Sequence, residues 1–395
     1  MYMGALEGLV VLDATQVMAG PFCAMQLADL GADVIKIEAP GGDPTRYWTG
    51  ALGTDSPTFN AVNRGKRGIV LNLKQPAAQS VFRRLARLAD IVVENYRPGV
   101  MAAFGLDYAG LVAGNERLIY ASISGYGQTG PDASKGGFDL VAQGVSGIMS
   151  ITGEPGGPPV KCGVPLTDLG AGLFALAAIL AALHHRTRTG RGQYIDTSLV
   201  EAGVALSVWE ATEHLSGGAI PQPTGSAHRF SAPYQAIRCA DGYITLGAAN
   251  DRLFTRLCGL LGHPEWVERA EFADDSARVR HRVELAALIE AITVAHPRAY
   301  WLERLGAHDI PCGPINTYDE VTRDPQIVAR NMVVTTNHPV LGRLRTLGSP
   351  LKMSDTPTIA DRPAPLLGEH TEQVLLGAGY TEPELAALRD AGAIG

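Results

Sequence analysis

The chain has 395 residues, 46% hydrophobic and 18% charged, which is ordinary for a globular protein with one large domain and a smaller one. Its formal net charge of −7 and the lack of a long basic run argue against nucleic-acid binding, which needs a clustered basic surface. Five scattered cysteines form no zinc or disulfide pattern and the N-terminus does not resemble a signal peptide, so we expect a cytoplasmic protein.

The first half of the chain alternates short apolar runs with helical stretches. Apolar strands that alternate with helices are typical of a parallel sheet covered on both faces, which predicts a Rossmann-like α/β domain. We expect strands at residues 9–12, 34–37, 68–73, 91–93 and 118–123, and helices at 21–30 and 76–89.

From Asp139 onward the pattern becomes mainly helical. The apolar run at residues 169–183 is shorter than a membrane span and is followed by His-His-Arg, which indicates a buried helix and no membrane association. A strand at 193–197 and one helix over 198–215 should follow.

A segment rich in Pro, Gly, Ser and Thr at residues 219–231 indicates a passage into a second domain. Asp241-Gly242 then predicts the turn of a β-hairpin. Amphipathic helices should follow, and the tail should return to mixed structure. We expect those helices at 251–262, 282–295, 299–306 and, at the chain end, 382–391.

Several standard catalytic signatures are absent from the sequence. It contains no GxxxxGK[ST], no GxGxxG after the first strand, no GxSxG and no HExxH. The adjacent His184 and His185 point in different directions on a helix and fit a solvated helix end. We therefore expect no metal site and no permanently bound cofactor, with chemistry done by side chains and by an activated bond of the substrate.

Asp168 precedes an apolar helix whose first turn is rich in glycine, within GVPLTDLGAGLFALAA. A carboxylate at such a place is stabilised by free backbone N–H groups and by the helix dipole. Its position alone favours a helix N-cap, and a nucleophilic carboxylate is the alternative.

Two polar loops follow expected strand ends. Residues 122–139 contain five glycines and form either an ordinary loop or one that covers a substrate. Residues 94–99, ENYRPG, could hold a nucleotide or form a simple surface turn.

Together these stretches resemble the family III (CaiB/BaiF-type) CoA-transferases, which include formyl-CoA transferase and carnitine CoA-transferase. The resemblance runs from about residue 4 to 392. The matching segments include LEGLVVLDATQVMAGPFCAMQLADLGADVIKIEAPGGDPTR, NRGKRGIVLNLK, DIVVENYRPGVM, SISGYGQTGP, GFDLVAQGVSG, ITGEPGGPPVKCGVPLTDLGAGLFA, HRTRTGRGQYIDTSL, GSAHRFSAPYQAIRCADGYITLGAAND, PCGPINTYDEV and PAPLLGEHT.

The resemblance implies an α/β fold with a Rossmann-like large domain formed by both chain ends, here residues 1–220 and 326–395. Residues 221–325 would form a smaller α+β domain, and two subunits would interlock as a homodimer. The expected small-molecule partners are an acyl-CoA and a carboxylic acid.

The resemblance also implies that Asp168 is the nucleophile. Its carboxylate would attack an acyl-CoA thioester, and an aspartyl-CoA thioester would form after a mixed anhydride. One thioester replaces another, so ATP is not needed. CoA would be a substrate and not a resident cofactor.

Matching this chain to the family by position yields the expected CoA-binding residues, which are Val17, Met18, Ala19, Lys74, Asn95, Tyr96, Phe104 and Gly136. Formyl-CoA transferase has Gln in place of Met18 and Tyr in place of Phe138, which disfavours a formate–oxalate enzyme here.

The chain is most similar to the branch that uses succinyl-CoA and other dicarboxylates, such as the succinate–hydroxymethylglutarate CoA-transferases. A dicarboxylate keeps one free carboxylate, which calls for a cationic anchor. The candidates for the substrate pocket are Phe138, Asp139, Arg46, His228 and Arg229.

Three alternatives remain open at this point. An α-methylacyl-CoA racemase would share the fold, but it needs a histidine where this chain has Phe138, and a phenyl ring cannot transfer a proton. A non-catalytic CoA-binding protein could lose the nucleophile, yet Asp168 is present. A NAD-dependent enzyme is disfavoured because its glycine fingerprint is missing.

Overall fold

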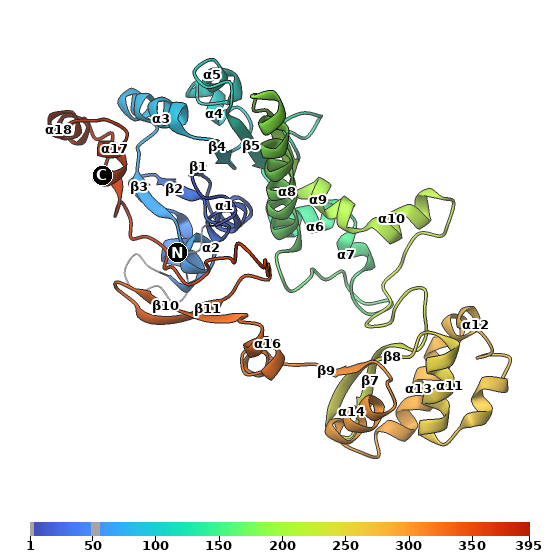
Figure 1. Ribbon diagram of the computed structural model, residues 1–395. Helices are drawn as coiled ribbons and strands as arrows, with labels where there is room; N and C mark the ends of the chain where they lie inside the picture. The colour runs from blue at the N-terminus through green and yellow to red at the C-terminus, as the bar shows by residue number, and fades with distance from the viewer. Residues whose placement is uncertain (1–3, 49–55) are drawn as a thin grey trace. The chain divides into compact units, whose positions relative to one another are not determined.

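The computed structural model describes residues 4–48 and 56–395, which divide into two compact units (Figure 1). Unit 1 comprises Met1–Ile148, Lys161–Gly217 and Pro325–Gly395, and unit 2 comprises Met149–Val160 and Gly218–Asp324. Residues 149–160 thus group with unit 2, although the sequence suggested that they belong with the large domain.

Unit 1 contains a six-stranded sheet in which every strand pair is parallel. The strand order is β3-β2-β1-β4-β5-β6, so the direction of winding reverses between β1 and β4. This is the strand order of a Rossmann fold. The strands are β1 (Val10–Ala14), β2 (Asp33–Glu38), β3 (Arg67–Val70), β4 (Ile91–Glu94), β5 (Ile119–Ser124) and β6 (Tyr194–Ser198).

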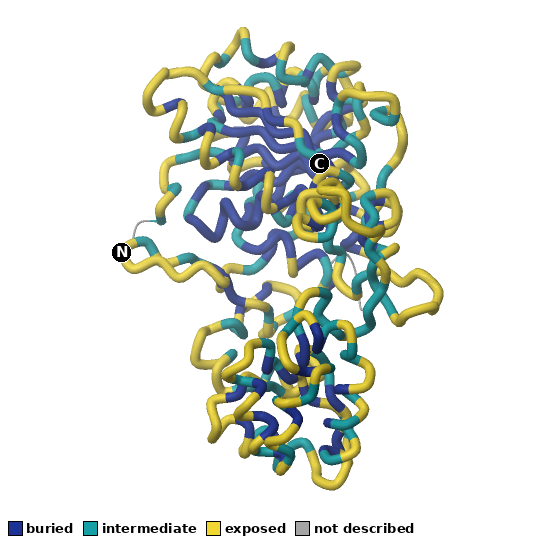
Figure 2. The backbone as a smooth tube through the Cα atoms, turned by 90° about the vertical axis from the view of Figure 1, so that its right-hand side faces the viewer, coloured by how far each residue is buried: buried dark blue, intermediate teal, exposed yellow. Residues whose placement is uncertain are grey.

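Strands β1 to β5 are mostly buried because both faces of the sheet are covered (Figure 2), and they are mainly apolar, with a few buried polar residues such as Asp13, Lys36 and Glu94. Leu12, Val92 and Tyr120 belong to the core on one face, together with residues of α3, α17 and α18. Val11 and Val93 belong to the core on the other face, with residues of α1 and α8.

The helices of unit 1 near the sheet include two that the sequence predicted, α1 and α3. Their bounds, with those of the other helices, are α1 (Ala19–Asp29), α2 (Pro57–Asn63), α3 (Pro76–Leu88), α4 (Val100–Ala103), α5 (Tyr108–Val112), α6 (Asp139–Val145), α7 (Ile148–Ile151, at the junction of the units), α8 (Leu166–Thr189), α9 (Leu199–Leu206), α10 (Val208–Leu215), α16 (Pro325–Ala329), α17 (Thr371–Gly377) and α18 (Glu382–Asp390); Pro44–Tyr47 forms a 3-10 turn.

The single helix predicted over residues 198–215 is wrong. Two helices, α9 and α10, meet at Ser207, whose ψ of 33° departs from helical geometry. The Ser207 hydroxyl donates to the carbonyl of Gly203, a local bond that competes with the regular helix.

Helix α8 is long and apolar enough to span a membrane by length and composition. Within unit 1 it packs along α1, α9, β5 and β6, with Ala171, Ala175 and Ile179 fully buried. It is buried only on that side, because Leu173 and Phe174 are exposed.

The C-terminal segment adds an antiparallel hairpin, β10 (Val333–His338) and β11 (Gly342–Leu347), which the sequence did not predict. The chain then returns to the sheet, where Ile394 pairs with Leu71 just beyond β3. Both ends of the chain therefore contribute to unit 1.

Unit 2 has its own antiparallel sheet and hydrophobic core. The predicted hairpin forms, but its turn comprises Ala240 and Asp241, and Gly242 is already the first residue of β8. Ile244, Phe254 and Trp301 are buried. Its elements are β7 (Tyr234–Cys239), β8 (Gly242–Gly247), α11 (Asp251–Leu261), a 3-10 turn at Pro264–Glu268, α12 (Asp275–Arg280), α13 (Arg282–Thr293), α14 (Arg298–Ala307), β9 (Cys312–Pro314) and α15 (Tyr318–Val321).

Candidate active site

A cavity of about 450 Å³ lies beyond the carboxyl ends of β1, β4 and β5. This is the switch point between β1 and β4, where open α/β sheets bind their ligands. Its lining comprises Gln16, Val17, Met18, Ala19, Asn95, Tyr96, Arg97, Pro98, Val100, Ile123, Ser124, Gly125, Lys135, Gly136, Gly137, Phe138, Asp168 and Leu199.

Asp168 lies in the first turn of α8, three residues after the N-cap position at Pro165. It is not the helix cap, and its carboxylate accepts no hydrogen bond from the residues that the structure describes. Burial, with the nearby charge of Asp139 as the second cause, raises the pKa of Asp168 to about 7. A half-buried carboxylate that no donor satisfies is a better nucleophile than a capped one.

Asp139 fixes the turn that carries Asp168. Its Oδ1 accepts from the backbone N–H of Thr167 at 2.9 Å and from the Thr167 hydroxyl at 2.8 Å. Its Oδ2 accepts from the amide of Gln143 at 2.7 Å. Asp139 does not line the cavity, so its contacts make it a positioning residue.

The turn after β1 is held in an unusual backbone conformation. Val17 has a φ of 70°, which a β-branched residue rarely adopts. Its N–H donates to Asp43 at 3.2 Å, while the side-chain amide of Asn95 both donates to and accepts from the backbone of Gln16. Asn95 therefore ties the ends of β1 and β4 together across the switch point.

A cluster of buried ion pairs lies next to the turn after β1 and includes Asp43, which accepts the hydrogen bond from Val17. Lys66 pairs with Asp13 at 2.7 Å and Lys36 pairs with Asp43 at 3.2 Å. The charge of Lys36 and hydrogen bonds from Thr45 hold the pKa of Asp43 below its usual range despite desolvation. The carboxylate that anchors Val17 is consequently ionised.

Arg46 belongs to the same cluster, which argues against the substrate role suggested from sequence. Its side chain is fully buried, binds both oxygens of Glu38 at 2.7 Å and lies 3.6 Å from the centroid of the Phe59 ring. It does not line the cavity.

The glycine-rich loop is closed at its base by two glycines in direct contact. A Cβ on Gly125 would lie 2.7 Å from the Cα of Gly137, and one on Gly137 would lie 2.5 Å from the Cα of Gly125. Only glycine fits at either position. Residues 126–136 thus form a closed loop that presents Lys135 and Gly136 to the cavity.

Of the residues expected from sequence, eight line this cavity: Val17, Met18, Ala19, Asn95, Tyr96, Gly136, Phe138 and Asp168. Phe138 is 73% exposed there. Lys74 is exposed elsewhere on unit 1, and Phe104 packs partly into the core. His228 and Arg229 belong to unit 2, where the ring of His228 packs on Tyr234 and Arg229 donates to the carbonyl of Gln222.

Two cationic side chains of the cavity were not assigned from the sequence. The Arg97 guanidinium is exposed beside Gly136, and Lys135 forms an ion pair with Asp132 at 2.7 Å. Each adjoins an assigned residue, so a search for cations beside the expected CoA contacts would have found both. Cations suit the phosphates of a nucleotide.

The site thus joins a half-buried carboxylate with a raised pKa to a cavity of about 450 Å³ at the switch point of a Rossmann sheet. The model of CoA-transferase family III matches residues 6–371. The chain belongs to this family and is a CoA-transferase.

Individual relatives agree. The succinate–glutarate CoA-transferase of Agrobacterium fabrum is 41% identical over 94% of each chain, and the human succinyl-CoA:glutarate CoA-transferase is 39% identical over 98% of this chain and 90% of its own. A CaiB/BaiF family protein from Brucella suis has a similar structure, with a TM-score of 0.86 and 39% identity over 96% of this chain and all of that one.

Proposed function

We propose that this enzyme transfers CoA from succinyl-CoA to a dicarboxylic acid, with Asp168 as the covalent carrier. The observation that carries the proposal is the Asp168 carboxylate, which lacks a hydrogen-bond donor among the described residues and faces a cavity at the switch point.

The chemistry proceeds by exchange of acyl bonds. An Asp168 oxygen attacks the thioester carbonyl, the C–S bond breaks, and CoA leaves as a thiolate. The thiolate attacks the Asp168 carbonyl of the mixed anhydride and expels the donor acid as a carboxylate. The acceptor carboxylate then attacks the resulting Asp168–CoA thioester and repeats the steps in reverse.

CoA would lie along the cavity-lining residues that follow the carboxyl ends of β1 and β4. Val17, Met18 and Ala19 would adjoin the thioester, while Asn95 and Tyr96 would follow the nucleotide. Arg97 and Lys135 add charges that suit its phosphates. No cofactor is required, because the thioester supplies the activated bond.

Succinyl-CoA as donor and a C4 or C5 dicarboxylate such as glutarate as acceptor follow from the relatives, whose names specify succinate and glutarate. His228 and Arg229 remain the candidates for a cation that holds a free carboxylate of the substrate. The phenyl ring of Phe138 would contact the methylene groups between the two carboxylates.

We also propose that the enzyme works in the cytoplasm as an interlocked homodimer, with residues 1–220 and 326–395 as the CoA-binding domain and 221–325 as the smaller domain. Unit 1 exposes many large apolar side chains on α6, α8, α9 and α10, as protein interfaces do. Its residues include Leu140, Val141, Val145, Leu173, Phe174, Leu180, Val204, Leu206, Val208 and Trp209.

The covalent step is tested by incubating the protein with succinyl-CoA, digesting it and measuring the mass of the peptide that contains Asp168. We expect CoA, or a hydroxamate after hydroxylamine treatment, on Asp168. An unmodified peptide, together with exchange that persists in Asp168→Ala, would refute the mechanism. Deuterium exchange at Cα of a 2-methylacyl-CoA would indicate a racemase instead.

The acceptor is tested by offering malate, citramalate, itaconate, mesaconate, glutarate and oxalate with succinyl-CoA. We expect kcat/KM to be highest for a dicarboxylate with a carbon spacer, and oxalate to react poorly. Preference for oxalate would contradict the assignment.

A further inference from the structure

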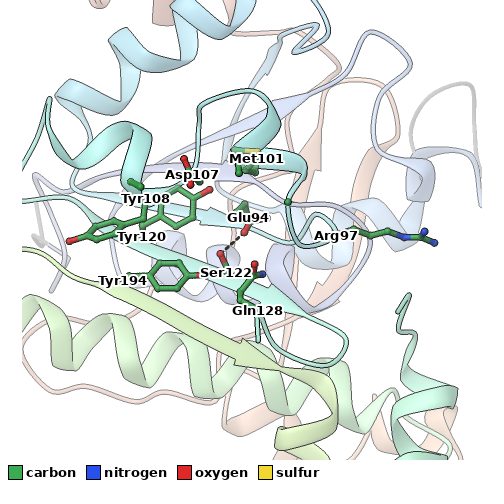
Figure 3. Close-up of a pocket in the computed structure, with 12 residues that line it drawn as sticks. Glu94, Arg97, Met101, Asp107, Tyr108, Tyr120, Ser122, Gln128 and Tyr194 are labelled. Atoms are coloured by element: carbon green, nitrogen blue, oxygen red, sulfur yellow. Dashed lines mark hydrogen bonds between the residues drawn. The ribbon is translucent and has the colours of Figure 1, made fainter. Parts of the chain in front are cut away.

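A second cavity, of about 310 Å³, lies on the sheet face opposite α8 (Figure 3). In the strand register Glu94 lies beside Ser122, and Tyr120 lies beside Tyr194. Neighbouring residues in register point to the same face of a sheet, so these four side chains lie on the face whose core includes Tyr120. Asp168 is not part of this cavity. Its lining comprises Glu94, Arg97, Gly99, Met101, Ala102, Asp107, Tyr108, Ala109, Tyr120, Ser122, Gln128 and Tyr194.

Glu94 is the buried acid of this cavity, with an exposed fraction of 4%. Its Oε2 accepts from the backbone N–H of Tyr96 at 2.8 Å, and its Oε1 accepts from the hydroxyl of Ser122. Burial raises the pKa of Glu94 to about 7. The buried surroundings of Glu94 therefore disfavour the ionised form of its carboxylate.

Glu94 differs from the other buried acids in the described part of the chain. Asp13, Asp29, Glu38 and Asp43 each form an ion pair with a buried lysine or arginine at 2.6–3.2 Å. Across residues 4–48 and 56–395 no such cation pairs with Glu94. Among the described residues Glu94 has only hydrogen-bond donors as partners, so its negative charge is not neutralised by a side chain and could pair with a cation from outside the chain.

Three tyrosines form the wall beside Glu94. The ring centroids of Tyr108, Tyr120 and Tyr194 lie 5.7–6.4 Å apart. Aromatic faces attract organic cations, most strongly where water is excluded. Asp107 adds a second acid at this wall, whereas Arg97 extends away from the tyrosines in Figure 3.

A metal ion does not fit this lining. Calcium needs six to eight oxygen ligands and magnesium nearly ideal octahedral geometry. The described residues contain no group of three acids, histidines or cysteines placed to hold a metal. One buried carboxylate beside aromatic rings suits an ammonium group on an organic molecule.

We propose that this cavity binds a small organic ammonium ion, with its charge on Glu94 and its alkyl groups against the tyrosines. The proposal is independent of the reaction at Asp168. Because Arg97 lines both cavities, the occupant would lie next to the loop that borders the CoA site.

The probe is choline, compared by titration calorimetry with 3,3-dimethylbutan-1-ol, its neutral isostere. We expect saturable binding of choline, and binding of the isostere at least about tenfold weaker. Glu94→Gln should weaken choline binding about tenfold or more, because the amide keeps an acceptor but loses the charge. Glu116→Gln, which changes an exposed acid outside the cavity, should bind choline like the wild type.

A second pair of variants tests the aromatic wall independently of Glu94. Tyr194 lies on the edge strand and is 40% exposed, so the fold should tolerate its replacement. Tyr194→Leu should lose at least about threefold in choline affinity and Tyr194→Phe should retain it. Absence of saturable choline binding to the wild type, equal binding of the neutral isostere, or unchanged binding in Tyr194→Leu would overturn the proposal.

Discussion

The carboxylate of Asp139 accepts two hydrogen bonds from Thr167, the residue immediately before Asp168. Asp139 therefore has two effects: it orients the first turn of α8, and it places a negative charge near Asp168 in that turn. Both the orientation and the pKa of Asp168 depend on Asp139.

The first prediction separates these two effects. Asp139→Asn keeps an oxygen that accepts from Thr167 but removes the charge, which should lower the pKa of Asp168. The acid limb of the profile of kcat/KM against pH should move to lower pH by about half a unit. Asp319→Asn, an exposed acid in unit 2, serves as control, and an unshifted limb in Asp139→Asn would contradict the coupling.

A second prediction concerns stability. Desolvation raises the pKa of Asp168 to about 7, so folding disfavours its ionised form. The contribution of Asp168 to stability should be complete below its unfolded pKa of about 4 and should be lost as pH rises through about 7. Asp168→Asn, which cannot ionise, should therefore melt above the wild type at pH 8, and the difference should shrink at pH 4. A constant difference in Tm between these pH values would show that ionisation is not the cause.

A third prediction tests the base of the glycine-rich loop. In Gly137→Ala the new Cβ meets the backbone of Gly125, so the loop must shift at the edge of the cavity. We expect kcat/KM for the acyl-CoA to fall by about tenfold or more, as small misplacements at an active site produce. Gly259→Ala, where nothing lies near the added Cβ, should leave activity intact. Wild-type kinetics in Gly137→Ala would show that the loop position is unimportant.

A fourth prediction distinguishes a structural Arg46 from a substrate anchor. Arg46→Ala leaves Glu38 buried without its cation and should lower the free energy of unfolding by about 3–5 kcal/mol. The double variant Glu38→Gln/Arg46→Met removes both charges and should recover much of that loss, as denaturant unfolding can measure. If the double variant is stable but its KM for the dicarboxylate rises more than about tenfold, Arg46 acts on the substrate after all.

The sequence by itself predicted the parallel sheet, because strands buried on both faces are rich in apolar residues, and this pattern can be recognised without tertiary information. Residues that line the cavity, such as Asn95, Tyr96 and Asp168, were assigned through the resemblance to the family, because their local positions alone fitted a surface turn and a helix N-cap. The break at Ser207 was missed because it depends on a hydrogen bond from the side chain to the preceding turn, which leaves no clear pattern in the sequence. The hairpin of β10 and β11 was missed because its strands are half exposed, and the alternation of apolar and polar residues in them is weak.

Only the tertiary structure decided which charges face a ligand. Arg46 and Asp139 resemble substrate-binding residues in the sequence, yet one is paired inside the fold and the other binds Thr167. Glu94 shows the converse: that no buried cation from the described part of the chain pairs with it is visible only in the folded structure. Ion pairing depends on distances between residues far apart in the chain, and those distances are set by packing.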